Sequence, residues 1–122
     1  MSETENQVVD LNRFPYNTSR ACALLKSMGN QHRLMILYQL VTGEKCVGEL
    51  VKILGLSQSA LSQHLARLRR DNLVSTRREA QTIHYSLSGK EASKIIETLY
   101  GLYCGNEGLL SYDEENEASM AI

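Results

Sequence analysis

The sequence predicts a mainly α-helical domain with a β-hairpin wing, in the element order of a winged helix-turn-helix. Five stretches of the chain carry apolar residues at intervals of three and four, the period of a helix with one buried face. Between the fourth and the fifth stretch the interval changes to two, the period of a strand. Only residues 55–57, which include a glycine, separate the third stretch from the fourth. Such a short turn is typical of a helix-turn-helix pair.

The first two helices are delimited by residues that favour helix ends. Residues 17–19 (Asn-Thr-Ser) follow the only proline, Pro15, and are expected to begin the first helix. Its apolar stripe consists of Ala21, Leu24, Leu25 and Met28. Gly29 then interrupts the pattern, and Asn30 is expected to cap a second helix that ends near residues 42–43.

The third and fourth helices form the helix-turn-helix pair. The third is expected over residues 46–54 and is short, with Gly55 as a suitable C-terminal stop. Ser57 is positioned to cap the fourth helix. The buried side of the fourth helix is expected to consist of Leu61, Leu65 and Leu68.

The hairpin and a last helix complete the domain. Apolar and polar residues alternate over 74–77 and 83–87, which predicts two antiparallel strands. The intervening residues 78–81 lack Asn-Gly or another sharp hairpin signal. Ser88 is expected to open the last helix, which ends before Gly105. One side of that helix carries Ile95, Ile96, Leu99, Leu102 and Tyr103.

Charge is distributed unevenly along the chain. The net charge is −1, yet all 13 Lys and Arg residues lie between residues 13 and 104, together with only six of the 14 acidic residues. A basic body is the electrostatic pattern of a phosphate-binding surface, because Lys and Arg release counterions from DNA. The alternative is an ordinary solvated surface.

The exposed face of the fourth helix carries residue types that read DNA. The second helix of such a pair enters the major groove with its N-terminal residues at base edges. Here those residues are Gln58, Ser59, Ser62 and Gln63. Gln can pair with adenine, and Ser with any base or with a phosphate. The basic residues suited to phosphates or a minor groove are Arg67, Arg70, Arg77 and Arg78. We expect double-stranded DNA as the partner; exposed positions of a plain helix bundle are the alternative.

Four motifs resemble the ArsR/SmtB family of homodimeric repressors: residues 28–34 (MGNQHRL), 47–50 (VGEL), 56–65 (LSQSALSQHL) and 83–87 (IHYSL). Gln31 departs from the proline of many members. The resemblance spans the DNA-binding and dimerisation domain expected over 17–104, between a flexible acidic segment over 1–16 and an acidic, disordered tail over 105–122. It implies a homodimer through the first and last helices, and an operator that is an imperfect inverted repeat.

The metal sites of this family are incomplete in the sequence. Metal-sensing members carry a Cys-x-Cys pair on the third helix, but here Gly48 follows Cys46 at the second position. Another family site uses Asp and His on the last helix, and residues 88–104 contain neither. The histidines His32, His64 and His84 are scattered without ligand spacing, which indicates surface or packing roles. We therefore expect no metal and no cofactor.

Cys46 and Cys104 resemble the cysteines of the persulfide-sensing BigR/SqrR branch of the family and of HlyU-type regulators. Cys46 is expected at a helix N-terminus with Lys45 beside it, and both features favour the reactive thiolate. Cys22 matches no sensing position and is interpreted as a packing or incidental residue.

The sequence thus predicts a repressor released from operator DNA when reactive sulfur species, such as persulfide, link Cys46 to Cys104. A sensor of a thiophilic metal or metalloid such as As(III), or a general thiol redox regulator, are the alternatives. An enzyme is not expected, since no Cys-x-x-Cys, nucleophile-base pair or phosphate loop is visible. Short apolar runs and an acidic N-terminus predict a cytoplasmic protein without a membrane span.

Overall fold

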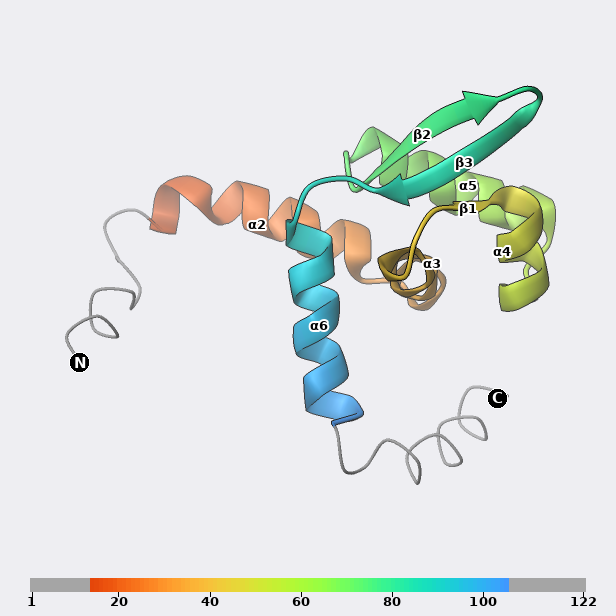
Figure 1. The fold of residues 1–122 in the computed structure, drawn as a ribbon. Helices are drawn as coiled ribbons and strands as arrows, with labels where there is room; N and C mark the ends of the chain where they lie inside the picture. The colour runs from red at the N-terminus through yellow and green to blue at the C-terminus, as the bar shows by residue number, and fades with distance from the viewer. Residues whose placement is uncertain (1–13, 106–122) are drawn as a thin grey trace.

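The computed structural model describes residues 14–105 and confirms the winged helix-turn-helix (Figure 1). The helices are α2 (Phe14–Met28), α3 (Gln31–Val41), α4 (Val47–Leu54), α5 (Gln58–Arg70) and α6 (Glu91–Tyr103), and the strands are β1 (Lys45–Cys46), β2 (Val74–Glu79) and β3 (Thr82–Leu87). Helices α4 and α5 form the helix-turn-helix pair, and β2 and β3 form the wing. The acidic segments expected at the two ends lie mostly outside the described residues.

Helix α3 is the centre of the domain, because it contacts α2, α4, α5, α6 and β3. The fully buried apolar side chains are Ile36, Leu37, Leu50, Leu61, Leu65 and Leu68. The buried side predicted for α5 is therefore confirmed. This core fixes α5 and the wing relative to each other, which positions the site described below.

The predicted start of α2 at residues 17–19 is wrong, since the helix begins at Phe14. Pro15 is its second residue. Proline is tolerated in the first turn of a helix, where its missing N–H would have no intrahelical partner. The end of α2 is tied to α3 by Arg33, whose Nε donates to the Ser27 carbonyl at 2.6 Å and whose Nη2 donates to the Lys26 carbonyl at 3.2 Å.

The caps predicted for α3, α4 and α5 are confirmed. The Asn30 side chain accepts hydrogen bonds from the backbone of the first turn of α3. The Ser57 hydroxyl accepts from the Ala60 N–H at 3.1 Å. Gly55 ends α4 with a left-handed backbone (φ 71°), a conformation that glycine adopts without strain. These local interactions explain why α4 stops and α5 starts where the sequence predicts.

The sheet contains a strand, β1, that the sequence pattern does not predict. The strand order is β1-β3-β2, and both pairings are antiparallel. The predicted turn over 78–81 is too long, because Arg78 pairs with Ile83 and Glu79 with Thr82. The turn is Ala80-Gln81, and Ala80 adopts a positive φ of 57°.

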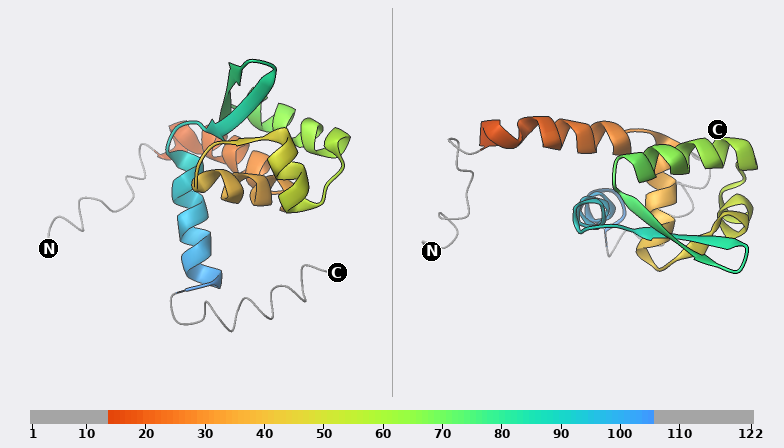
Figure 2. Two further views of the ribbon diagram at one scale, coloured as in Figure 1. Left: turned by 45° about the vertical axis from the view of Figure 1, so that its right-hand side comes forward. Right: turned by 90° about the horizontal axis from the view of Figure 1, so that it is seen from above.

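Helix α6 begins at Glu91 and not at Ser88. The Ser88 N–H instead donates to the Leu73 carbonyl at 2.9 Å, and Gly89 takes a left-handed φ of 77° before the helix starts. Figures 1 and 2 show α2 and α6 extending beyond the rest of the domain. Large apolar residues exposed on them are Leu25, Leu102 and Tyr103. No described helix is long and apolar enough to cross a membrane.

Candidate nucleic-acid interface

Helix α5 presents an open polar face at its N-terminal end. The Ser57 cap fixes this end, and Gln58, Ser59, Ser62 and Gln63 are all exposed. Their side chains form no hydrogen bond with any other described residue. The structure therefore leaves the predicted base-reading groups available for an outside partner.

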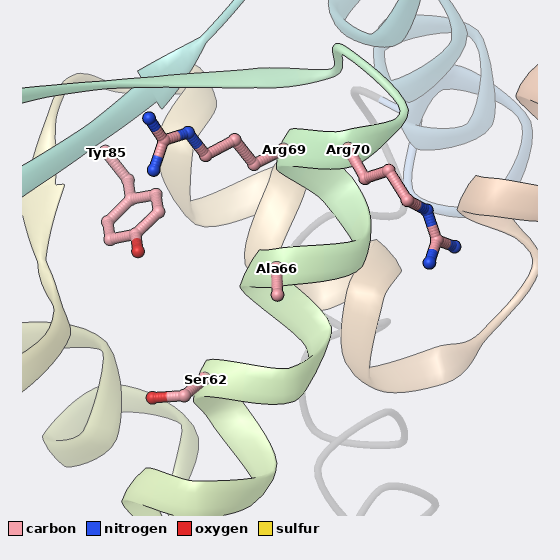
Figure 3. Close-up of a pocket in the computed structure, with 5 residues that line it drawn as sticks. All are labelled: Ser62, Ala66, Arg69, Arg70 and Tyr85. Carbon is pink, nitrogen blue, oxygen red and sulfur yellow. The ribbon is translucent and has the colours of Figure 1, made fainter.

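Further along α5, a hollow of about 410 Å³ separates the helix from β3 (Figure 3). It is lined by Ser62, Ala66, Arg69, Arg70 and Tyr85. Figure 3 shows the Arg69 side chain extending towards Tyr85, whereas Arg70 points to the other side of α5. Ala66 contributes only a methyl group to its lining.

Arg69 and Tyr85 were not predicted as site residues. Arg69 follows Ser62 by seven residues, two helical turns, so helical periodicity would have placed both on one face. Tyr85 is one of the apolar residues in the alternating pattern over 83–87. It does pack against the core, but it also lines the hollow.

The predicted phosphate-binding arginines of α5 are partly paired within the chain. Arg67 donates to Asp71 at 3.0 Å, and Arg70 lies 3.6 Å from the same carboxylate. Burial raises the pKa of Asp71, but hydrogen bonding, first from Arg67, together with the charges of Arg67 and Arg70 outweighs this and holds the pKa below its ordinary value. Among the described residues, Arg69 and Arg78 have no carboxylate partner.

Arg77 is held by two carboxylates. Its Nε lies 2.9 Å from Glu44 Oε2 and its Nη2 lies 2.7 Å from Glu44 Oε1, while Nη1 lies 3.2 Å from Glu79. The Glu44 hydrogen bond is the main cause that raises the pKa of Arg77, and the same bond lowers the pKa of Glu44. Of the two wing arginines, Arg78 is therefore the one whose charge is unpaired.

Two histidines lie behind the recognition helix. The rings of His32 and His64 have centroids 5.6 Å apart. Burial, followed by the positive charges of Arg33 and His32, lowers the pKa of His64. The predicted surface or packing roles agree with these positions, since His32 is exposed and His64 is half-buried between α3 and α5.

Cys46 lies where β1 meets α4. It is partly buried, it is the N-cap residue of α4, and its N–H donates to Glu49 Oε1 at 2.9 Å. Lys45 does not stabilise the Cys46 thiolate as expected. Its ammonium instead donates to the Gln39 carbonyl at 2.8 Å and to the Thr42 hydroxyl at 3.0 Å. The charged neighbour of Cys46 is the Glu49 carboxylate, whose pKa is lowered by hydrogen bonds from the Cys46 backbone and side chain.

Cys104 is the C-cap residue of α6 and is also partly buried. Its N–H donates to the Tyr100 carbonyl at 2.7 Å. The Tyr100 ring stacks on Tyr38 of α3 with a centroid distance of 6.1 Å, so this end of α6 rests on α3. Figure 1 shows that α6 runs away from the sheet, and its C-terminal end lies apart from β1.

Exposure and spacing describe the third cysteine and the metal-ligating residue types. Cys22 is exposed, so the structure gives it no packing role. A methyl group built at Gly48 would lie 4.0 Å from Cys46 Sγ, which places position 48 next to the thiol. Within residues 14–105, no three His, Cys, Asp or Glu side chains are grouped to hold a metal ion.

Comparison with known proteins identifies the family. Residues 30–76 match the model of the bacterial regulatory protein, arsR family. The chain is 54% identical over 96 residues to the transcriptional activator HlyU of Vibrio cholerae, which covers 79% of this chain and 89% of that protein. The chain belongs to the ArsR family.

Solved structures of this family share the fold. Reduced HlyU from Vibrio cholerae matches with a TM-score of 0.71 and 56% identity, covering 75% of this chain and 96% of that one. The transcriptional repressor BigR from Xylella fastidiosa matches with a TM-score of 0.76 and 34% identity, covering 80% of this chain and all of that one (100%). The predicted resemblance is confirmed, and this ArsR-family member is a DNA-binding transcriptional regulator and not an enzyme.

Proposed function

We propose that this ArsR-family regulator is a cytoplasmic homodimeric repressor, released from operator DNA when persulfide sulfur links Cys46 to Cys104. The observation that carries the proposal is the position of Cys46. It caps the first helix of the helix-turn-helix and is hydrogen-bonded, through β1, to the wing sheet. A chemical change at this one residue therefore reaches the wing through β1 and the recognition helix α5 through α4, which packs against it.

The DNA-binding half of the proposal rests on exposed, unpaired groups. The N-terminal face of α5 offers Ser62 and Gln63 to base edges. Arg69 in the hollow and Arg78 on the wing offer unpaired cations to phosphates on either side. Figures 1 and 2 show that α5 and the wing lie together at the side of the domain from which α6 runs away.

The homodimer is proposed to form through α2 and α6. Both helices extend beyond the core, and both expose large apolar residues: Leu25 is 59% exposed and Leu102 70%. A second copy would remove these side chains from water. Two recognition helices about 34–36 Å apart would then match an imperfect inverted repeat with half-sites one helical turn apart.

The sulfur chemistry balances without a further oxidant. Each thiol takes one sulfane sulfur from a low-molecular-weight persulfide, RSSH, and releases RSH. The two protein persulfides then condense to a trisulfide, Cys46–S–S–S–Cys104, and release H2S. A direct disulfide needs Cα atoms about 4.4–6.8 Å apart, and the C-terminal end of α6 lies apart from β1 (Figure 1). A trisulfide reaches across a wider gap than a direct disulfide, and the movement of α6 and β1 towards each other on its closure is the proposed cause of DNA release.

Mass spectrometry tests this assignment directly. Reduced protein is treated separately with glutathione persulfide, peroxide and As(III), then digested without reduction. The proposal predicts a linked pair of peptides containing Cys46 and Cys104, heavier by one sulfur and lighter by two hydrogens than the two free peptides. A link between two copies of Cys104, or an As(III) adduct without a persulfide link, would reject the two-thiol mechanism in favour of its alternatives.

A further inference from the structure

Cys46 belongs to a row of three residues that crosses the wing sheet. It pairs with His84 of β3, and His84 pairs with Arg77 of β2. Residues directly opposite in adjacent strands have side chains on the same face. Since Tyr85 faces the hollow beside α5, its neighbour His84 faces the other way. The row therefore lies on the face of the sheet that points away from α5.

A second connection joins the same segment to the wing. Glu44, two residues before Cys46, holds Arg77 through two parallel hydrogen bonds of 2.7 and 2.9 Å. The strand order places β3 between β1 and β2, so β1 and β2 share no backbone hydrogen bond. The Glu44–Arg77 pair is thus a direct side-chain link from the Cys46 segment to the far strand of the wing.

The geometry of the Glu44–Arg77 pair indicates that it orients the wing more than it stabilises the fold. Both side chains are partly exposed, 53% for Arg77 and 33% for Glu44, and an ordinary ion pair of this kind contributes little to stability. A two-bond guanidinium–carboxylate contact, however, also fixes the orientation of its partners. It therefore constrains where β2 lies. The residue after Arg77 is Arg78, the unpaired cation of the wing.

We propose that Glu44 is a positioning residue that couples the Cys46 segment to the wing. A chemical change at Cys46 moves the segment that carries Glu44, releases Arg77 and loosens β2, and Arg78 loses its fixed position. The wing then carries part of the change in DNA affinity. The inference deepens the proposed function, and it rests on that function for the claim that Cys46 is the residue modified.

Hydrogen exchange tests the coupling without persulfide. The full chain carrying Cys22→Ser and Cys104→Ser retains Cys46 as its only thiol, which is alkylated with iodoacetamide. We expect amide exchange in residues 74–79 to become about two- to fivefold faster after alkylation. In the same background, Glu44→Gln should give this increase without alkylation, and alkylation should then add little.

Matched variants separate coupling from general destabilisation. Glu97→Gln makes the same charge change on α6, where Glu97 has no side-chain partner among the described residues, and should leave residues 74–79 unchanged. Arg77→Gln breaks the pair from its other side and should reproduce Glu44→Gln. Protection of residues 31–41 in α3 should persist in every variant, because the core is untouched.

The possible outcomes separate this inference from the proposed function. Unchanged exchange in residues 74–79 after alkylation, or in both Glu44→Gln and Arg77→Gln, would overturn the coupling. Faster exchange throughout α3 as well would overturn it too, since the effect would then be unfolding. Faster exchange confined to the wing, with operator binding that persulfide does not weaken, would support the coupling and contradict the proposed function.

Discussion

Arg69 of α5 and Tyr85 of β3 face each other across the hollow between the recognition helix and the wing (Figure 3). The guanidinium has no carboxylate partner in the described part of the chain, and the hollow opens beside the exposed Ser62. A cation between the two elements proposed to contact DNA suits a backbone phosphate that lies between the major groove and the wing.

Arg69→Gln is expected to weaken operator binding for all sequences and to reduce the slope of log affinity against log salt by about 0.9, the contribution of one phosphate contact. Arg70→Gln should have a smaller effect, because Arg70 points to the other side of α5 and lies near Asp71. Gln63→Ala should instead blur preference at one base pair. Fluorescence anisotropy at several salt concentrations measures all three. An unchanged slope for Arg69→Gln would show that no DNA phosphate binds Arg69 in the hollow.

The two wing arginines should behave differently. Arg78→Gln is expected to lower the salt slope by about 0.9, because Arg78 is unpaired. Arg77→Gln should change the slope less than Arg78→Gln, since Glu44 and Glu79 already neutralise the charge of Arg77 and its loss acts on DNA only by loosening the strand that carries Arg78. The same titration measures both variants, and equal slopes would contradict this difference between the two arginines.

Protonation of His64 should lower stability in mild acid. Burial and the charges of Arg33 and His32 lower its pKa in the folded state, so the unfolded chain binds this proton more readily. The contribution of neutral His64 is complete above the ordinary histidine pKa of about 6.5 and is lost as the pH falls below it. Urea unfolding should therefore give a lower free energy near pH 5.5 than near pH 7.5. His64→Gln should reduce this difference, and an identical pH dependence in that variant would contradict the assignment.

Leu102→Glu should convert the proposed dimer to monomers. Leu102 is 70% exposed in the single chain, so a charge there costs the folded protomer little but would be buried in the dimer. Ile53→Glu, at a 48% exposed position on α4, is the control and should remain dimeric. Sedimentation velocity measures the mass of each variant. A Leu102→Glu protein that stays dimeric would place the interface elsewhere.

Features determined by near neighbours in the chain could be predicted from the sequence. The caps Asn30 and Ser57 and the stop at Gly55 depend on residues within one turn, and all three are confirmed. The buried side of α5 follows from its helical period. Pro15 was wrongly expected to precede the first helix. A proline within the first turn of a helix and a proline just before a helix give similar sequence patterns.

Features that depend on distant partners could not be predicted. Strand β1 has two residues, too few to show a period, and exists because β3 pairs with it. Glu44 and Arg77 are 33 positions apart, and nothing in the local sequence joins them. The row that brings His84 opposite Cys46 likewise arises only from strand register, whereas the sequence showed His84 as one of three scattered histidines.

The central claim is that thiol chemistry at Cys46 and Cys104 controls operator binding. Its most direct measurement is the operator affinity of one protein preparation before and after glutathione persulfide, followed by a reductant. We expect affinity to fall about 5- to 150-fold, the range of common allosteric coupling energies, and to recover on reduction. Cys46→Ser and Cys104→Ser should bind DNA normally and not respond, while Cys22→Ser should respond like the unchanged protein. Full persulfide release in the Cys104→Ser protein would contradict the two-thiol account.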